Sequence, residues 1–133
     1  MIKFEWKDIY ILGDFVIDAQ HQHLFEIAKA LVETEDIVAL NRLTLELFRH
    51  TRDHFEYEED IMRQHHYPGL AVHIERHNEL LNRLNTVSLD VGHGKLNKPV
   101  IEALMVDWVI THITYEDAEF SAYVQLQHSK KNQ

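Results

Sequence analysis

Residues 70–87, LAVHIERHNELLNRLNTV, carry an apolar or histidine side chain at every third or fourth position. This spacing places those side chains on one face of an α-helix, because a helix completes a turn in about 3.6 residues. The members of the face are Leu70, His73, Ile74, His77, Leu80, Leu81, Leu84 and Val87. Such an uninterrupted seam is typical of a helix that packs against other helices.

Three further segments show the same periodicity. The first lies near the N-terminus, and Asp18 is its expected N-cap residue. The second comes directly before the segment quoted above, and the third lies near the end of the chain. Their apolar faces contain, in turn, His21, Leu24, Phe25, Ala28, Leu31 and Val32; Leu43, Leu47, His50, His54, Tyr57 and Ile61; and Ile101, Leu104, Met105, Trp108, Val109, His112, Phe120 and Tyr123. The sequence therefore predicts four amphipathic helices.

Short breaks separate these helices: TED at 34–36, HHYPGL at 65–70 and DVGHGKLNKP at 90–99. Short connections between long helices favour antiparallel neighbours, so we predict an all-α, antiparallel, up-down-up-down four-helix bundle. The irregular N-terminal residues, which include several aromatic side chains, are expected to form an arm packed along the bundle.

The length of 133 residues is that of one domain. We therefore predict a single domain over residues 1–133, with an N-terminal arm over 1–17 and the four-helix bundle over 18–128.

The composition excludes several classes of protein. The chain has no cysteine, which rules out disulfides, zinc–thiolate sites and iron–sulfur clusters. Its formal net charge of −9 opposes binding to nucleic acid or anionic membranes. The start MIKFEWKDIYILGDF lacks the features of a signal peptide, and no apolar stretch approaches the length of a membrane span. We expect a cytoplasmic protein with no membrane insertion and no nucleic-acid partner.

Histidine is unusually abundant, at 11 of 133 residues. His21, His54, His73, His77 and His112 all fall on the apolar faces and together come from all four helices. A buried imidazole costs a few kcal/mol unless its nitrogens find partners. Five inward imidazoles would compete for too few acceptors, whereas a metal accepts all their lone pairs at once, so the pattern predicts a buried metal site.

Carboxylates lie on the same faces as the histidines. Glu58 follows His54 by four residues, while Glu116 and Asp117 follow His112 by four and five. On an ideal helix the four-residue spacing favours Glu116 as the inward carboxylate. A local widening of the helix, which is common at functional sites, would instead bring Asp117 inward.

Counting ligands indicates how many ions the site takes. Five imidazoles and two carboxylates are too many for one six-coordinate ion, and they suit two ions bridged by both carboxylates. With a bridging oxygen from solvent, the ion with three histidines is filled and the ion with two keeps one open position. Nitrogen and oxygen ligands without thiolate suit iron or manganese. An open position beside a redox metal suits a small diatomic ligand.

Four motifs give the chain a family resemblance: IDAQHQHLF at 17–25, HTRDHFEYEEDIM at 50–62, YPGLAVHIERH at 67–77 and DWVITHITYED at 107–117. A lone histidine followed by HxxxE, HxxxH and HxxxxD, in this order, resembles the hemerythrins, most closely the single-domain bacteriohemerythrins. The resemblance covers nearly the whole chain.

The resemblance implies a ligand set for two irons. His73, His77 and His112 would bind one iron, His21 and His54 would bind the other, and Glu58 and Asp117 would bridge the two. It selects Asp117 over Glu116, and it selects His21 over His23 because the family histidine follows DxQ. His50 has no role in the family pattern and is expected to be a core imidazole or a partner of the ligands.

The resemblance also implies a function. Hemerythrins hold two non-haem irons with a bridging oxo or hydroxo group and bind dioxygen reversibly as a hydroperoxide at the open iron, which requires that water stay out. The residues at the positions of the family's apolar oxygen pocket are Leu24, Phe55, Trp108, Val109 and Ile113. The same residues also suit plain bundle core, and the sequence leaves both roles open. We expect an oxygen storage, delivery or sensing protein, not an enzyme.

Other functions of such a site remain as alternatives. A di-iron oxidase or peroxidase of the ferritin-like type uses carboxylate-rich sites with Glu-x-x-His pairs, and no histidine here follows a glutamate by three residues. Nitric oxide scavenging or iron buffering would use the same residues. An unidentified protein recipient of the oxygen is a further expected partner.

Overall fold

The computed structural model describes residues 4–131, with side chains described as far as residue 127. Its helices are α1, Phe15–Glu33; α2, Ile37–Gln64; α3, Leu70–Gly92; α4, Lys98–Met105; and α5, Ala118–Lys131. A π-helical segment, η2, Val106–Asp117, joins α4 to α5 without a break. A short 3₁₀ turn, η1, Asp8–Tyr10, lies in the N-terminal arm.

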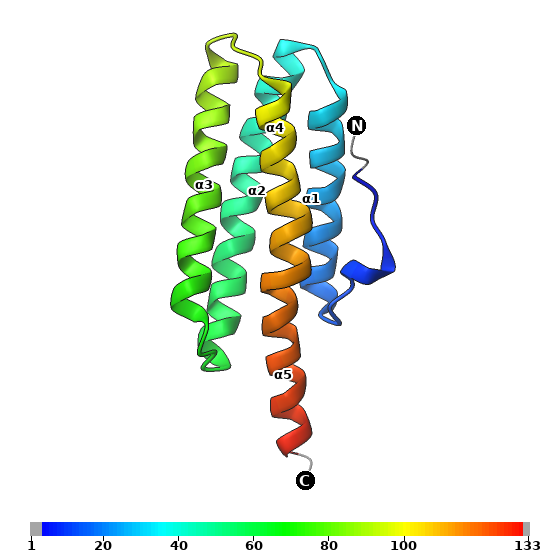
Figure 1. Cartoon of the computed structure of the whole chain (residues 1–133), viewed down its shortest axis with the longest axis vertical. Helices are drawn as coiled ribbons and strands as arrows, with labels where there is room; N and C mark the ends of the chain where they lie inside the picture. The colour runs from blue at the N-terminus through cyan, green and yellow to red at the C-terminus, as the bar shows by residue number, and fades with distance from the viewer. Residues whose placement is uncertain (1–3, 132–133) are drawn as a thin grey trace.

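The helices alternate in direction along the bundle. α1 and α3 run one way, α2 and the continuous α4–η2–α5 helix run the other, and α5 projects past the ends of its neighbours (Figure 1). Residues 4–131 contain no β-strand. The prediction of an all-α, up-down-up-down four-helix bundle is confirmed. None of the helices in this part of the chain combines the length and the apolar character needed to cross a bilayer.

The first helix begins earlier than the sequence pattern predicted. Asp14 is the N-cap, and its side chain accepts a hydrogen bond of 3.0 Å from the backbone N–H of Ile17. Asp18, the expected cap, lies inside the helix and accepts instead from the backbone of Leu12 and Gly13. Gly13 has a φ of +98°, which turns the chain so that Asp14 precedes the first helical residue. The prediction of Asp18 as the cap was therefore wrong.

The buried face of α2 also differs from the predicted one. It consists of Leu40, Thr44, Leu47, Thr51, His54, Phe55, Glu58 and Met62. His50 and Tyr57, which were placed on this face, are exposed, so the expectation that His50 is a core imidazole or a partner of the ligands was wrong. The apolar pattern did not predict that Thr44 and Thr51 would be buried on this face. Both hydroxyl groups form hydrogen bonds: Thr44 donates to the carbonyl oxygen of Asn41, and Thr51 accepts from Trp108 Nε1 at 2.9 Å.

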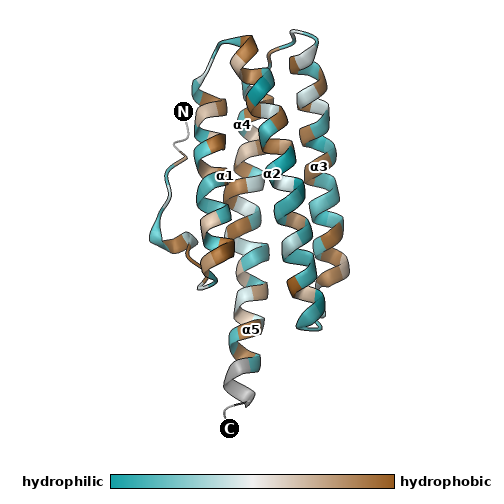
Figure 2. Cartoon of the chain, turned by 180° about the vertical axis from the view of Figure 1, so that it is seen from behind, coloured by the Kyte–Doolittle hydropathy of each residue, from teal (hydrophilic) through white to brown (hydrophobic). Residues whose placement is uncertain are grey.

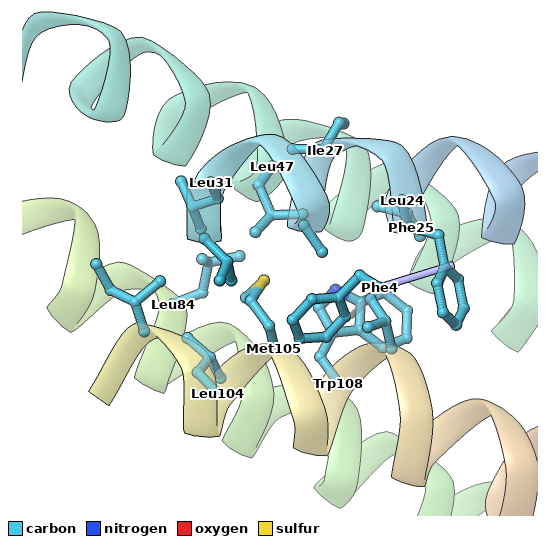
Figure 3. Close-up of a cluster of buried hydrophobic side chains, with 14 of the residues drawn as sticks. Phe4, Leu24, Phe25, Ile27, Leu31, Leu47, Leu84, Leu104, Met105 and Trp108 are labelled. Carbon is cyan, nitrogen blue, oxygen red and sulfur yellow. The ribbon is translucent and has the colours of Figure 1, made fainter. Parts of the chain in front are cut away.

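The apolar core fills the end of the bundle at which the α1–α2 and α3–α4 connections lie. Figure 3 shows Leu31, Leu47, Leu84 and Leu104, one from each long helix, pointing toward one another. These four side chains are at most 1 % exposed, and burying each contributes about 1.5–3 kcal/mol. Hydrophilic residues cover much of the outer faces of α2 and α3 (Figure 2).

A lysine ties two helices together at this end. The ammonium of Lys98, at the start of α4, donates to the carbonyl oxygens of Leu31, Val32 and Thr34 at the C-terminus of α1. A cation at a helix C-terminus is favourable, because the last carbonyls there have no partner within the helix.

The N-terminal arm runs along the outside of α1 (Figure 1). Trp6 and Tyr10 pack on Phe25 of α1, with ring centroids 5.4 and 4.7 Å away, and Phe4 is 3 % exposed. Phe15, at the point where the arm meets α1, is 87 % exposed. The aromatic residues of the arm thus pack on α1, and the arm also contacts the fourth helix, where Ser121 Oγ donates to the carbonyl oxygen of Leu12 at 2.8 Å.

Candidate metal centre

All seven residues that the sequence singled out as ligands lie together toward the end of the bundle opposite the apolar core. They come from α1, α2, α3 and η2, and each is at most 4 % exposed. The group consists of His21, His54, Glu58, His73, His77, His112 and Asp117. Burial of seven ionisable side chains in one place is costly unless they neutralise one another or hold a cation.

Glu58 stands at the middle of this cluster. Its Oε1 lies 2.8 Å from His73 Nε2 and 3.1 Å from His77 Nε2. Its Oε2 lies 3.3 Å from His54 Nε2, on the opposite side. One carboxylate therefore faces imidazoles of both expected ions.

Asp117 has the same relation to the histidines. Its Oδ1 lies 2.9 Å from His73 Nε2 and 3.2 Å from His112 Nε2, and its Oδ2 lies 3.1 Å from His21 Nε2. The donor atoms thus form two groups, and within each group they lie within 4.8 Å of one another. One group is Glu58, His73, His77, His112 and Asp117; the other is His21, His54, Glu58 and Asp117. Both carboxylates belong to both groups.

Asp117 faces the cluster because the helix is widened. η2 is π-helical, with hydrogen bonds that reach five residues along the chain, so His112 and Asp117 share a face. The side chain of Asp117 is 2 % exposed, whereas that of Glu116 is 30 % exposed. The spacing argument that favoured Glu116 assumed an ideal α-helix, which this segment does not form.

Three of the imidazoles form hydrogen bonds through Nδ1 with side chains outside the group of seven. His54 Nδ1 donates to Gln20 Oε1 at 2.6 Å, and His77 Nδ1 donates to Glu59 Oε2 at 2.7 Å. His112 Nδ1 donates to the carboxylate of Glu116. A hydrogen bond at Nδ1 fixes the tautomer that leaves Nε2 free for a metal, which is the usual arrangement for metal-binding histidines.

Sequence reasoning did not identify Gln20 and Glu59 as part of the site. Each is next in sequence to an expected ligand, Gln20 to His21 and Glu59 to Glu58, but each supports a histidine on another helix. Gln20 is the glutamine of the DxQ pattern that selected His21, and Glu59 is adjacent to a ligand, but neither signal names the histidine that each supports, because tertiary packing sets that partner.

The arrangement fits a metal. His21 Nε2 and His54 Nε2 are 2.9 Å apart, and His77 Nε2 and His112 Nε2 are 3.0 Å apart, so ring nitrogens that can act as metal ligands converge in pairs. Two buried oxygens, Oε2 of Glu58 and Oδ2 of Asp117, accept no hydrogen bond from any described residue. Cations between these atoms would accept the lone pairs and neutralise the carboxylates together.

The pKa values of the buried groups in the metal-free protein also fit a metal site. Burial lowers the pKa of the His73 imidazole, but hydrogen bonds to Asp117 and Glu58 outweigh it and raise that pKa to about 9. The same balance against Asp117, Glu116 and Glu58 raises the pKa of His112 well above its usual value. Burial raises the pKa of Glu58, but the surrounding imidazoles, of which His73 and His77 lie within hydrogen-bond distance, bring it well below the ordinary range. Protons on His73 and His112 would thus partly neutralise the carboxylates that a metal ion would otherwise neutralise.

Metal binding is expected to release protons. At pH 7.5, below the pKa of about 9, the His73 imidazole is protonated, and it must lose its proton to coordinate a metal. The raised pKa of His112 acts in the same direction. Loading the metal-free protein with Zn²⁺ or Fe²⁺ in weak buffer should therefore release at least about one proton per chain. A pH indicator dye in a stopped-flow instrument measures this release. Binding at the same stoichiometry without acidification would contradict it.

Apolar side chains form the wall beside the cluster. Leu24, Phe55, Trp108, Val109 and Ile113, the expected oxygen-pocket residues, are at most 1 % exposed. Phe55 stacks on the His77 ring with centroids 3.6 Å apart, and Trp108 lies 4.7 Å from Phe55. All five belong to the hydrophobic core, so they are core residues whether or not they also line an oxygen pocket. They keep water from the side of the cluster that they cover.

Five buried imidazoles and two shared carboxylates inside a four-helix bundle are the donor set expected of a helical metal-binding protein. The family described as "Hemerythrin HHE cation binding domain" matches residues 12–124. The chain therefore belongs to the hemerythrin family.

Similar proteins occur in bacteria and in animals. A bacteriohemerythrin of Clostridium acetobutylicum is 29 % identical, over 88 % of this chain and 98 % of its own length. One from Stenotrophomonas maltophilia is 25 % identical, over 90 % of this chain and 80 % of its own. A myohemerythrin of Riftia pachyptila is 27 % identical, over 88 % of this chain and 90 % of its own. The similarity thus extends through all four helices.

Proposed function

We propose that this chain binds dioxygen reversibly at a pair of non-haem iron ions. The observation that carries the proposal is the sharing of Glu58 and Asp117 by two groups of donor atoms with unequal numbers of histidines. The ligands of the group with three histidines would be His73, His77 and His112, and those of the other His21 and His54. The group with two histidines has fewer protein ligands, which leaves room for an external one.

The residues around the site suit reversible binding. A pair of ferrous ions held there supplies two electrons and an open coordination position to dioxygen. Leu24, Phe55 and Trp108, each 1 % exposed, exclude water from their side of the site. Gln20 and Glu59 hold His54 and His77 in fixed orientations, which limits the rearrangement that ligand binding requires.

The proposal includes the finer features expected from the resemblance. These are a bridging oxo or hydroxo group in the resting cofactor, the reduced form in which the dioxygen is held, and the absence of catalytic turnover. They also include a cytoplasmic location and a protein that receives the oxygen. The relatives named bacteriohemerythrin and myohemerythrin support the proposal through family membership.

Metal analysis followed by oxygen titration tests the proposal. Protein loaded with Fe²⁺ without oxygen is expected to hold about two irons per chain. Exposure to oxygen should produce a visible absorption band that disappears on deoxygenation and returns over repeated cycles. Zinc-loaded protein is the control, because Zn²⁺ cannot change its oxidation state.

Two results would contradict reversible oxygen binding. One is a single iron per chain, and the other is a band that forms once and does not reverse. Continuous oxygen uptake in the presence of a reductant would identify an oxidase instead.

A further inference from the structure

A second group of metal-binding side chains lies on the surface, outside the buried cluster. His23 extends from α1, while Glu46 and His50 extend from the neighbouring α2. The side chains of both histidines are 46 % exposed, and that of Glu46 is 41 % exposed. The buried centre uses none of these three residues.

The two imidazoles meet across the α1–α2 interface. The rings of His23 and His50 are 4.6 Å apart between centroids and nearly perpendicular, at 75°. Glu46 lies one helical turn before His50, and its Oε1 is 4.0 Å from His50 Nε2. The nearest carboxylate to His23 is Glu26, at 3.9 Å. Both distances exceed that of a hydrogen bond, so these carboxylates do not fix the imidazoles in place.

We propose that His23, His50 and Glu46 form a surface site for one divalent transition-metal ion. One donor atom from each residue lies within 4.8 Å of the other two. Ligands of a single tetrahedral zinc lie roughly 3.3 Å apart, given metal–ligand distances of about 2.0 Å. Half-exposed side chains close this gap by small rotations, because the packing of α1 against α2 already places their backbones.

The donor set selects the kind of ion. Two imidazoles and a carboxylate suit Zn²⁺, Ni²⁺, Co²⁺ or Cu²⁺, whereas Mg²⁺ and Ca²⁺ prefer oxygen ligands alone. Three protein ligands leave at least one position for water. A cavity of about 360 Å³ between α1 and α2, lined in part by His23, His50 and Leu24, provides space for it.

The ion would join two helices. His23 belongs to α1, while Glu46 and His50 belong to α2, so a bound ion links the helices only when they are packed as in the folded chain. A ligand that binds the folded state alone raises the unfolding temperature. The surface site is therefore expected to stabilise the protein as well as bind metal.

Zinc titration of the iron-loaded protein tests the site. Calorimetry and elemental analysis of the wild-type chain should show one zinc per chain beyond what the buried centre holds. His23→Gln and His50→Gln should bind this zinc at least tenfold more weakly. The matched control is His93→Gln, which removes another exposed histidine at the end of α3 and should bind zinc as the wild type does. Mg²⁺ at the same concentration should not bind.

Thermal unfolding gives an independent measure. Zinc should raise the unfolding temperature of the wild type and of His93→Gln by more than it raises that of His50→Gln. Equal zinc affinity in the wild type and in both site variants would overturn the proposal, as would loss of the zinc in His93→Gln. The comparison does not depend on how many ions the buried centre takes, because that centre is intact in every variant.

Discussion

Asp117→Ala is expected to abolish stable metal binding at the buried site. The two oxygens of Asp117 lie within 3.2 Å of Nε2 atoms from His21, His73 and His112, on three different helices. Without this carboxylate, both proposed ions lose a ligand, and the imidazoles lose one of the two negative charges that hold them together. The affinity for Fe²⁺ or Zn²⁺ should fall by more than about 100-fold, because even changes outside the ligands cost 10–100-fold. Metal analysis after gel filtration measures the loss.

The neighbouring residue supplies the matched control. Glu116 accepts a hydrogen bond from His112 Nδ1 and is 30 % exposed, so it orients a ligand without facing the ions. Glu116→Ala should keep two metal ions at stoichiometric concentrations, with an affinity lowered by about 10–100-fold. Metal loss in Glu116→Ala together with full occupancy in Asp117→Ala would reverse the assignment of the two carboxylates.

His77→Ala should reduce both metal content and stability. The His77 ring is fully buried, stacks on Phe55 and donates to Glu59. Its removal leaves a cavity and a partly buried carboxylate without its donor, which together should lower the free energy of unfolding of the metal-free protein by about 2–4 kcal/mol. The loss should be larger in the loaded protein, because bound metal no longer stabilises the fold to the same extent. Urea unfolding of both forms provides the measurement.

The histidine that follows α3, His93, provides a control for the loss of an imidazole in general. His93 is exposed at the C-terminal end of α3, and His93→Ala should change the unfolding free energy by less than about 0.5 kcal/mol. His77→Gln, which retains polarity, tests whether the cavity accounts for the instability. Two bound irons in His77→Ala would exclude His77 as a ligand.

The sequence predicted the bundle because the apolar spacing and the breaks at Pro68 and Gly69 act locally. Where the structure differed, a specific contact was responsible. Asp14 displaced Asp18 as the helix cap because Gly13 turns the chain just before it. The face of α2 was misjudged at His50 because buried Thr51 looks polar in sequence and is satisfied only by Trp108 from another part of the chain.

Some residues of the site could likewise be predicted from the sequence, and others could not. Histidines on apolar faces marked the cluster, since few other arrangements explain inward imidazoles from every helix. Spacing alone placed Glu116 inward, and the resemblance placed Asp117 there; the π-helical geometry of η2 brings Asp117 to the cluster. Gln20 and Glu59 could not be assigned, because each binds a histidine that is distant in sequence.

The wide helix Val106–Asp117 has a consequence for how this chain tolerates insertions and deletions. A π-helix has more residues per turn than an α-helix, so each residue rotates the chain by a smaller angle about the helix axis. Removing one residue would rotate all the following residues about that axis relative to the other helices. Asp117 would swing away from the histidines, and Phe120, now buried, would turn outward. The number of residues in this stretch is therefore as much a part of the site as the identity of its side chains.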